Sequence, residues 1–184
     1  MLSAPERDAL LRVARASITG DREAVDAVAR AERDHPALAA ERATFVTLET
    51  IGAGGDRELR GCVGTIEPAG SIARATADNA IRAAFHDPRF APVAADELPS
   101  VRISVSVLEP PTTVRGPREV IAGKHGVILI RGPYRALFLP QVAREAGWDV
   151  ATLLAELSRK AGLPKDGWRD ATLQVFGAES FGEP

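Results

Sequence analysis

Two glycines stand inside a segment that otherwise has the composition of a β-strand, residues Leu59–Ile66. A glycine in a strand interior weakens the strand, and it often marks a bulge or a place where another backbone or a ligand comes close. The β-rich segment Ala43–Thr50 precedes it and the glycine turn Gly52–Asp56 joins the two, so the pair predicts a hairpin. With Gly61 and Gly64 in its second strand, this hairpin is expected to have a close neighbour.

The rest of the chain predicts helices and antiparallel strands in mixed order. Ser3 and Glu6 form a capping box before a helix that Gly20 ends, and Asp21 caps a second helix. The other expected elements are the helices Ser71–Phe85, a short one opened by Pro140 and a longer one capped by Asp149, and the strands Val101–Leu108, Val127–Ile130, Arg135–Leu139 and Ala171–Ala178. Because no regular strand–helix–strand rhythm appears, the order favours an α+β fold. Such a chain can form two lobes, with the glycine-containing strand at their seam.

Composition and charge narrow the classes of partner. The net charge is −2 and the basic residues form no stripe with interleaved aromatics, so nucleic-acid binding is not expected. Apolar runs such as Val127–Ile130 are far shorter than the roughly 18 residues of a membrane helix, so no membrane association is expected. The first residues are charged and lack the apolar stretch of a secretory signal. A single cysteine fits a reducing compartment, which predicts a cytoplasmic protein.

The single cysteine, Cys62, lies between the two glycines and two residues after Arg60. Strand periodicity places Arg60 on the same face, where its charge would stabilise the thiolate, the reactive form of cysteine. Neighbours without side chains also leave the sulfur accessible. The alternative is structural, because free cysteine is among the most buried residue types and acts as a small hydrophobe. Spacing alone favours this structural interpretation, and Arg60 changes the balance only slightly.

Four other polar residues are candidates for a site. His125 lies in the turn at 123–126, before a strand, and loops often carry catalytic groups, although a turn histidine is more often merely solvated. His86 is a further candidate acid or base. Asn79, on an apolar helical face, and Arg89 are candidates for a cleft wall. Their structural alternatives are anchoring a neighbouring backbone and pairing with a carboxylate. No histidines or cysteines share metal-ligand spacing, so no metal site is predicted.

Six segments, in this order, resemble the motifs of the AMMECR family, the AMME-syndrome candidate-region proteins, whose prokaryotic members are called AmmeMemoRadiSam system protein A. They are LRGCVG (59–64), NAIRAAFHDPRF (79–90), ELPSVRISVSVLEPP (97–111), GKHGVILI (123–130), LFLPQVAREAGWD (137–149) and KAGLPKDGW (160–168). The similarity covers residues 5–182 as one domain, and six motifs in register are highly specific. The chain departs from the family pattern at Ser158, where many relatives carry a second cysteine, and at Ala136, a frequent glycine. A mechanism that needs two thiols is therefore excluded.

The resemblance implies an α+β fold with a larger lobe that contains both termini and a smaller inserted lobe. It places the LRGC segment near the groove between them. The family has no well-established biochemical activity. Its prokaryotic members are associated with a Memo-like protein and a radical-SAM protein, which implies these two as partners. Their metal and cluster chemistry is not carried over, because this chain lacks Cys-x3-Cys-x2-Cys, and the cofactor is left open.

Three hypotheses remain open for the LRGCVG segment. In the first, the chain is an enzyme acting on a small-molecule ligand in an inter-lobe cleft. Cys62 is then the nucleophile, Arg60 the thiolate stabiliser or anion anchor, and His125 or His86 the acid or base. The candidate substrate-binding residues are Gly61, Gly64, Asn79 and Arg89. In the second, a non-catalytic binding module presents the segment to a partner protein. In the third, the segment is a tight strand crossing that only glycine and a small residue can fill.

Overall fold

The computed structural model describes residues 1–20, 23–52 and 56–184, and within them the chain forms two compact units. The larger unit contains Met1–Val107 and Glu179–Pro184, and the smaller unit is the intervening segment Leu108–Ala178. Each has a four-stranded sheet and a hydrophobic core of its own. The fold is therefore α+β, as the sequence predicts.

The larger unit combines helices and strands from both ends of the sequence. Its elements are α1 (Ala4–Thr19), α2 (Glu23–Asp34), the 3-10 helix η1 (Pro36–Ala39), β1 (Thr44–Ile51), β2 (Arg57–Gly64), α3 (Ile72–Phe85), β3 (Val101–Leu108) and β8 (Ala178–Gly182). The elements of the smaller unit are β4 (Thr112–Val114), the 3-10 helix η2 (Pro117–Glu119), β5 (Gly126–Arg131), β6 (Tyr134–Phe138), α4 (Pro140–Glu145), α5 (Val150–Lys160), the 3-10 helix η3 (Gly167–Asp170) and β7 (Thr172–Phe176).

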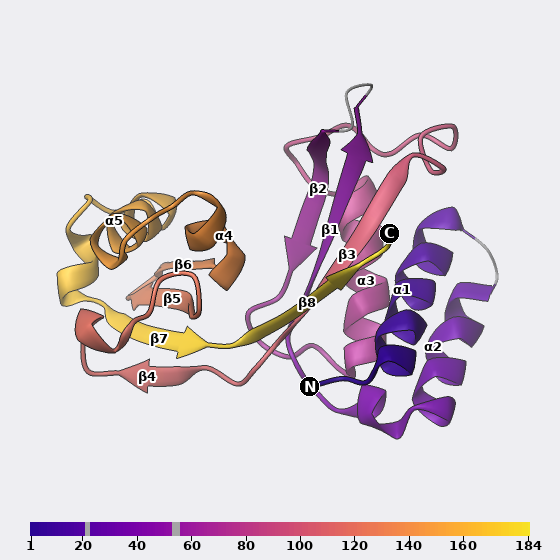
Figure 1. The fold of residues 1–184 in the computed structure, drawn as a ribbon, viewed down its shortest axis with the longest axis horizontal. Helices are drawn as coiled ribbons and strands as arrows, with labels where there is room; N and C mark the ends of the chain where they lie inside the picture. The colour runs from indigo at the N-terminus through magenta and orange to yellow at the C-terminus, as the bar shows by residue number, and fades with distance from the viewer. Residues whose placement is uncertain (21–22, 53–55) are drawn as a thin grey trace. The chain divides into compact units, whose positions relative to one another are not determined.

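The sheet of the larger unit has the strand order β2-β1-β3-β8, and its three helices lie on one side of it (Figure 1). Side chains that alternate along the strands separate into two faces. Val46, Leu48 and Ile103 are fully buried against the helical layer. Thr47 and Ser104 point to the opposite face and are partly exposed. Because β2 is an edge strand, one side of its backbone has no strand to pair with.

The local signals in the sequence explain where the helices begin and end. The Glu6 carboxylate accepts hydrogen bonds from the N–H and the hydroxyl of Ser3, which completes the capping box of α1. Gly20 ends α1 in the left-handed conformation, with φ of 74°. Ser71 and Asp149 accept backbone N–H groups in the first turns of α3 and α5. The predicted capping box, the end of α1 at Gly20 and the cap at Asp149 are confirmed.

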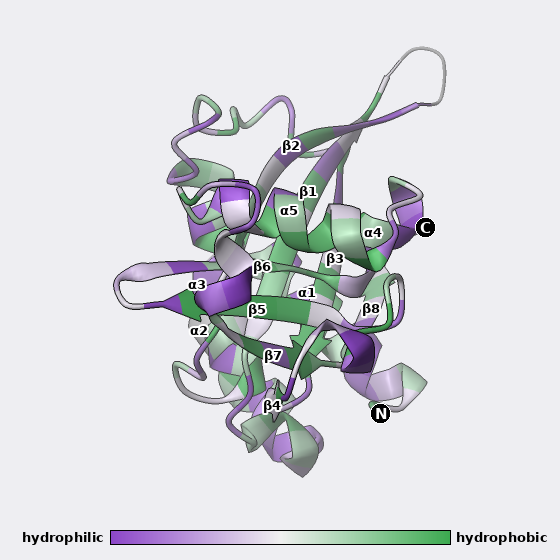
Figure 2. Ribbon diagram, turned by 90° about the vertical axis from the view of Figure 1, so that its left-hand side faces the viewer, coloured by the Kyte–Doolittle hydropathy of each residue, from purple (hydrophilic) through white to green (hydrophobic). Residues whose placement is uncertain are grey.

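The smaller unit has the strand order β4-β7-β5-β6, and Figure 2 shows β5 as a predominantly hydrophobic strand. The core forms where Val127 and Leu129 of β5 pack with Leu153 and Leu157 of α5. Ser158, the position where the resemblance points to a frequent cysteine, is fully buried on α5. Its hydroxyl donates to the Leu154 carbonyl and accepts the Trp168 N–H. The serine hydroxyl therefore connects α5 to η3.

The C-terminal strand differs from the sequence prediction. The strand expected over Ala171–Ala178 is β7, which ends at Phe176, and a further strand that the sequence analysis did not predict, β8, begins at Ala178 and belongs to the other sheet. The break falls at Gly177, whose carbonyl accepts the Glu109 N–H at 2.8 Å, and a side chain there would overlap the Glu109 carboxylate. A continuous β-rich run carries no local signal for a change of sheet. The short strand β4, which follows Pro110-Pro111, is likewise absent from the sequence prediction.

Two predicted features fall partly or wholly outside the described residues. The hairpin of β1 and β2 is confirmed, but residues 53–55 of its glycine turn are not described. The expected cap Asp21 also lies outside the described residues. Among those that are described, no helix is both long and apolar enough to cross a bilayer.

Candidate functional site

Cys62 lies on the edge strand β2, on the sheet face away from the helices. Its register partner on β1 is Thr47, and Thr47 pairs in turn with Ser104 of β3. The Thr47 hydroxyl donates a hydrogen bond to the Cys62 sulfur, with Oγ1 and Sγ 3.2 Å apart. The cysteine is partly exposed. The thiol thus belongs to a row of three small polar side chains, rather than to the apolar core.

Asp87 and Arg89 occupy the open edge of the sheet at Cys62. The Cys62 N–H donates to Asp87 Oδ2 at 2.9 Å, and Arg89 Nη2 donates to the Cys62 carbonyl at 3.1 Å. An unpaired strand edge would otherwise leave these groups to water or to another chain. The two side chains therefore replace a neighbouring strand at this one residue, and they fix the backbone that carries the thiol.

The Asp87–Arg89 pair also sets the charge around the thiol. Asp87 is buried, and the hydrogen bonds from Arg89 hold the pKa of its carboxyl well below the usual range, against the effect of burial. The same hydrogen bonds raise the pKa of Arg89, and attraction to Cys62 adds to the rise. About half of the Arg89 side chain is exposed. A permanent positive charge that interacts with Cys62 therefore faces solvent.

Arg60 makes different contacts from those that strand periodicity predicts. Leu48 pairs with Gly61 and the next residue of β1 pairs with Leu59, so Arg60 is the extra residue of a β-bulge. Its guanidinium donates to both carboxylate oxygens of Glu97, at 2.8 and 3.0 Å, and to two carbonyls at residues 91 and 92. The bulge interrupts the alternation on which the expected Arg60–Cys62 proximity depended.

The Arg60–Glu97 pair holds the segment after α3 against β2. The hydrogen bonds from Arg60, together with the Ala94 N–H, lower the pKa of Glu97 to about 2. The bond to Glu97 raises the pKa of Arg60. All of the hydrogen bonds found for the Arg60 guanidinium go to residues 91–97. Arg60 therefore holds residues 91–97 in place beside β2.

The two glycines of the motif are both covered by protein atoms. A Cβ at Gly61 would overlap the carbonyl oxygen of Ala83 in α3, so β2 approaches the helix backbone directly. A Cβ at Gly64 would overlap the ring of Phe45, its register partner on β1. The bulge and the close approach that the sequence predicts for these glycines are confirmed. Their candidate role in substrate binding remains a prediction.

Asn79 is buried in α3 and ties that helix to β1. Its amide nitrogen donates to the carbonyl and to the hydroxyl of Thr44, both at 3.0 Å. This bond satisfies the polar group on an apolar helical face, in the way that the structural alternative predicts. Asn79 therefore supports the hairpin from the helical side.

Neither candidate histidine takes part in the contacts described above for Cys62. His125 belongs to the smaller unit, where its Nδ1 accepts the Ile121 N–H at 3.2 Å and closes the turn before β5. His86 is exposed at the C-terminal end of α3 in the larger unit. No hydrogen bond joins Cys62 to a histidine in the described part of the chain. Nor do three histidine, cysteine, aspartate or glutamate side chains converge there as metal ligands.

The structure brings together most of the predicted residues and adds three. Arg60, Gly61, Cys62, Gly64, Asn79 and Arg89 all belong to the larger unit. The added residues are Thr47, Asp87 and Glu97. Thr47 could have been found from its outward position on the predicted strand, and Asp87 from its spacing to Arg89. Glu97 carries no local signal, because its partner is 37 residues away.

These features define a two-unit α+β protein whose single thiol lies at a sheet edge closed by charged side chains. Sequence and structure comparisons identify the class further. The family model described as AMMECR1 matches residues 11–181. The chain therefore belongs to the AMMECR1 family.

The relatives support this assignment along most of the chain. A protein of Thermococcus gammatolerans is 43% identical over 155 residues, covering 80% of this chain and 76% of that protein. Protein PF1979 of Pyrococcus furiosus is also 43% identical over 155 residues, covering 80% of this chain and 74% of that protein. The crystal structure of uncharacterized protein PH0010 from Pyrococcus horikoshii superimposes with a TM-score of 0.86 at 35% identity, over 99% of this chain and 93% of that chain.

Proposed function

We propose that this protein is an enzyme that uses Cys62 as a nucleophile toward a small electrophilic molecule. The observation that carries the proposal is the hydrogen bond from the Thr47 hydroxyl to the Cys62 sulfur, on a partly exposed face of the sheet. A hydrogen bond donated to sulfur favours the charged thiolate, which is the reactive form. A single free thiol of this kind fits a reducing compartment such as the cytoplasm.

Arg89, rather than Arg60, is the cation that we assign to the thiolate. Arg89 interacts electrostatically with Cys62 and is half exposed, so it can also contact an anionic group of a ligand. Arg60 is held by Glu97 and by two carbonyls, and it positions the strand instead. Asp87 keeps Arg89 in place and fixes the Cys62 backbone.

The proposed step is a displacement at an electrophilic carbon. The thiolate sulfur forms a bond to this carbon, and the electron pair of the broken bond leaves with the leaving group, which then takes up a proton. His86, which belongs to the same unit as Cys62, is the proposed proton donor. His125, the other histidine of the sequence prediction, uses its Nδ1 to accept the Ile121 N–H, so it would have to give up this hydrogen bond before it could donate a proton as an imidazolium.

The reactivity of the thiol can be measured without a known substrate. Because Cys62 is the only cysteine, iodoacetamide labelling followed by mass spectrometry reports on this residue alone. At pH 7 the folded protein is expected to react about three times faster than the same chain unfolded in urea. Cys62→Ser provides the blank. A folded-state rate equal to or below that of the unfolded chain would overturn the proposal.

A second candidate function is a binding module for a protein partner. The observation that favours it is a pair of exposed apolar side chains at the far end of the hairpin, Ile51 at 43% and Leu59 at 44% exposure. The partners implied by the family resemblance are the Memo-like and radical-SAM proteins. Co-purification with either one that survives Cys62→Ser and is lost in Leu59→Asp would favour this function over the enzyme. Binding to neither protein would remove it.

A further inference from the structure

The larger unit contains a pocket that the Cys62 site does not use. It lies between α1 and α2, in the helical layer, whereas the Cys62 side chain lies on the opposite face of the sheet. Its volume is about 480 Å³, which is within the usual range for small-molecule sites. It is open to solvent along one side, and the end of the chain at Glu183 closes part of its wall.

The pocket exists because small side chains face one another across the two helices. Ala9 and Ala16 of α1 and Ala27 and Ala31 of α2 all line it. Pairs of packed helices usually fill this space with larger apolar side chains. Here the alanines leave an apolar floor with room above it, to which Val13 adds.

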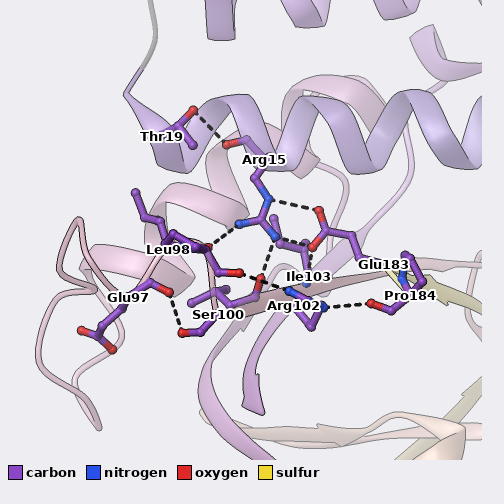
Figure 3. A network of polar contacts seen from close by, with 11 residues as sticks. Arg15, Thr19, Glu97, Leu98, Ser100, Arg102, Ile103, Glu183 and Pro184 are labelled. Carbon is purple, nitrogen blue, oxygen red and sulfur yellow. Dashed lines mark hydrogen bonds and ion pairs between the residues drawn. The ribbon is translucent and has the colours of Figure 1, made fainter.

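One wall of the pocket is rigid and electrically neutral. Figure 3 shows Arg15 of α1 reaching across to Glu183, with which it makes a two-pronged ion pair. The same guanidinium donates to the Leu98 carbonyl at 3.0 Å and to the Val101 carbonyl at 2.7 Å. Glu183 in turn accepts the Ile103 N–H. The charges of Arg15 and Glu183 therefore cancel within the wall.

The remaining charged residues give the pocket an excess of positive charge. Arg12 of α1 and Arg30 of α2 both line it and are exposed, and neither has an ion pair or hydrogen bond within the described residues. Among the described residues of the lining, the other acid is Asp34, which is paired with Arg33. Two arginines that have no partner among the described residues thus flank an apolar floor. Guanidinium groups bind carboxylate and phosphate oxygens through paired hydrogen bonds.

We propose that this pocket binds a small amphipathic anion, one with a carboxylate or phosphate group and a compact apolar body. The anionic group binds Arg12 and Arg30, and the apolar body packs on the alanines and Val13. Charge complementarity selects an anion, and the volume limits the ligand to a small molecule. The site is independent of the thiol chemistry proposed for Cys62.

The fluorescent anion 8-anilinonaphthalene-1-sulfonate is a suitable probe, because it combines one sulfonate with an apolar ring system. Titration of the intact protein is expected to show saturable binding to one site. Arg12→Gln and Arg30→Gln should each weaken it about 10-fold, as expected for the loss of a charge-assisted hydrogen bond. Arg74→Gln is the matched control, since Arg74 is an exposed arginine of α3 that pairs with Asp78 and does not line the pocket, and it should leave binding unchanged.

Two further measurements separate the pocket from non-specific binding. The uncharged analogue N-phenyl-1-naphthylamine should bind more weakly than the sulfonate, and the difference should shrink in Arg30→Gln. Ala16→Phe should block the pocket. Circular dichroism checks that it folds, and the arginine variants carry the test if it does not. The proposal is overturned if Arg12→Gln and Arg30→Gln bind the sulfonate as tightly as Arg74→Gln does.

Discussion

Each sheet contains a glycine directly opposite a phenylalanine on the next strand, and the two pairs differ in their surroundings. In the smaller unit, Gly126 of β5 pairs with Phe176 of β7, and the ring is only 3% exposed. In the larger unit, Gly64 of β2 pairs with Phe45 of β1, whose ring is half-buried. In both pairs the ring covers the glycine, so that any added side chain would overlap it.

The difference shows how one packing device serves two purposes. The strands of the Gly126 pair lie inside their sheet and help to close a core. The Gly64 pair lies at a sheet edge, where Asp87 and Arg89 take the place of a missing strand beside Cys62. A glycine–aromatic pair at an open edge leaves the thiol accessible on a fixed backbone.

The largest effect is expected for Gly61→Ala, the other glycine of the edge strand. The added methyl group meets the carbonyl of Ala83, and a helix backbone cannot move aside as a side chain can. We expect a loss of about 3 kcal/mol in the free energy of unfolding, the upper end for overpacking. Urea unfolding measures it. A loss below about 1 kcal/mol would mean that β2 and α3 are not in direct backbone contact.

The two glycine–phenylalanine pairs can be compared directly by Gly126→Ala and Gly64→Ala. The buried Phe176 ring has no room to move, so Gly126→Ala is expected to cost about 2 kcal/mol. The half-buried Phe45 ring can turn toward solvent, so Gly64→Ala should cost about 1 kcal/mol. Thermal unfolding of both variants gives the order. Equal costs, or a larger cost at Gly64, would contradict the contrast between a closed and an open pair.

The variant Asp87→Asn tests whether Asp87 and Arg89 hold the open edge of β2 at Cys62. The variant keeps the shape but weakens the bonds to the Cys62 N–H and to Arg89, at a cost of about 1.5 kcal/mol. Hydrogen exchange should also become faster at the Cys62 amide, because this N–H donates to Asp87 on the open edge of the sheet. Asp78→Asn, which removes an exposed i,i+4 pair with Arg74, is the control and should cost less than 0.5 kcal/mol.

The pH dependence of stability should reveal the Arg60–Glu97 pair. The pKa of Glu97 is about 2 in the folded protein and 4.5 in its ordinary state. A lowered folded-state pKa stabilises the fold fully above pH 4.5, and this contribution is lost as the pH falls toward 2. The native protein should therefore lose more stability than Glu97→Gln over this range. Parallel curves for the two proteins would show that the pair contributes nothing.

The sequence predicts much of the fold because most signals are local. Capping residues place α1 and α5, and the β-rich segment followed by a glycine turn predicts the hairpin of β1 and β2. The features that the sequence does not show are contacts between residues far apart in the chain. The change of sheet at Gly177 and the partner of Arg60 both depend on segments far along the chain.

The sequence predicts which segment forms the candidate site, but it does not predict which side chains contact Cys62. The glycines inside a strand pattern indicate a bulge and a close approach, and both are present. The same bulge interrupts the alternation of side chains along β2, and the prediction that Arg60 lies beside the thiol depended on this alternation. Arg89 takes the position near Cys62 because Asp87 holds it there, and only the folded backbone brings the two to the edge of β2.

The labelling rate of Cys62 in variants of its two neighbours tests the central claim most directly. If the Thr47 hydroxyl and the Arg89 charge activate the thiol, then Thr47→Val and Arg89→Gln should each slow iodoacetamide labelling at pH 7 by about 3- to 10-fold. Thr50→Val, on the same strand and paired with Glu58, should leave the rate unchanged. His125→Gln should also leave it unchanged, because iodide, the leaving group of iodoacetamide, takes up no proton. Rates for Thr47→Val and Arg89→Gln that equal the native rate would contradict the claim that Cys62 is an activated thiol.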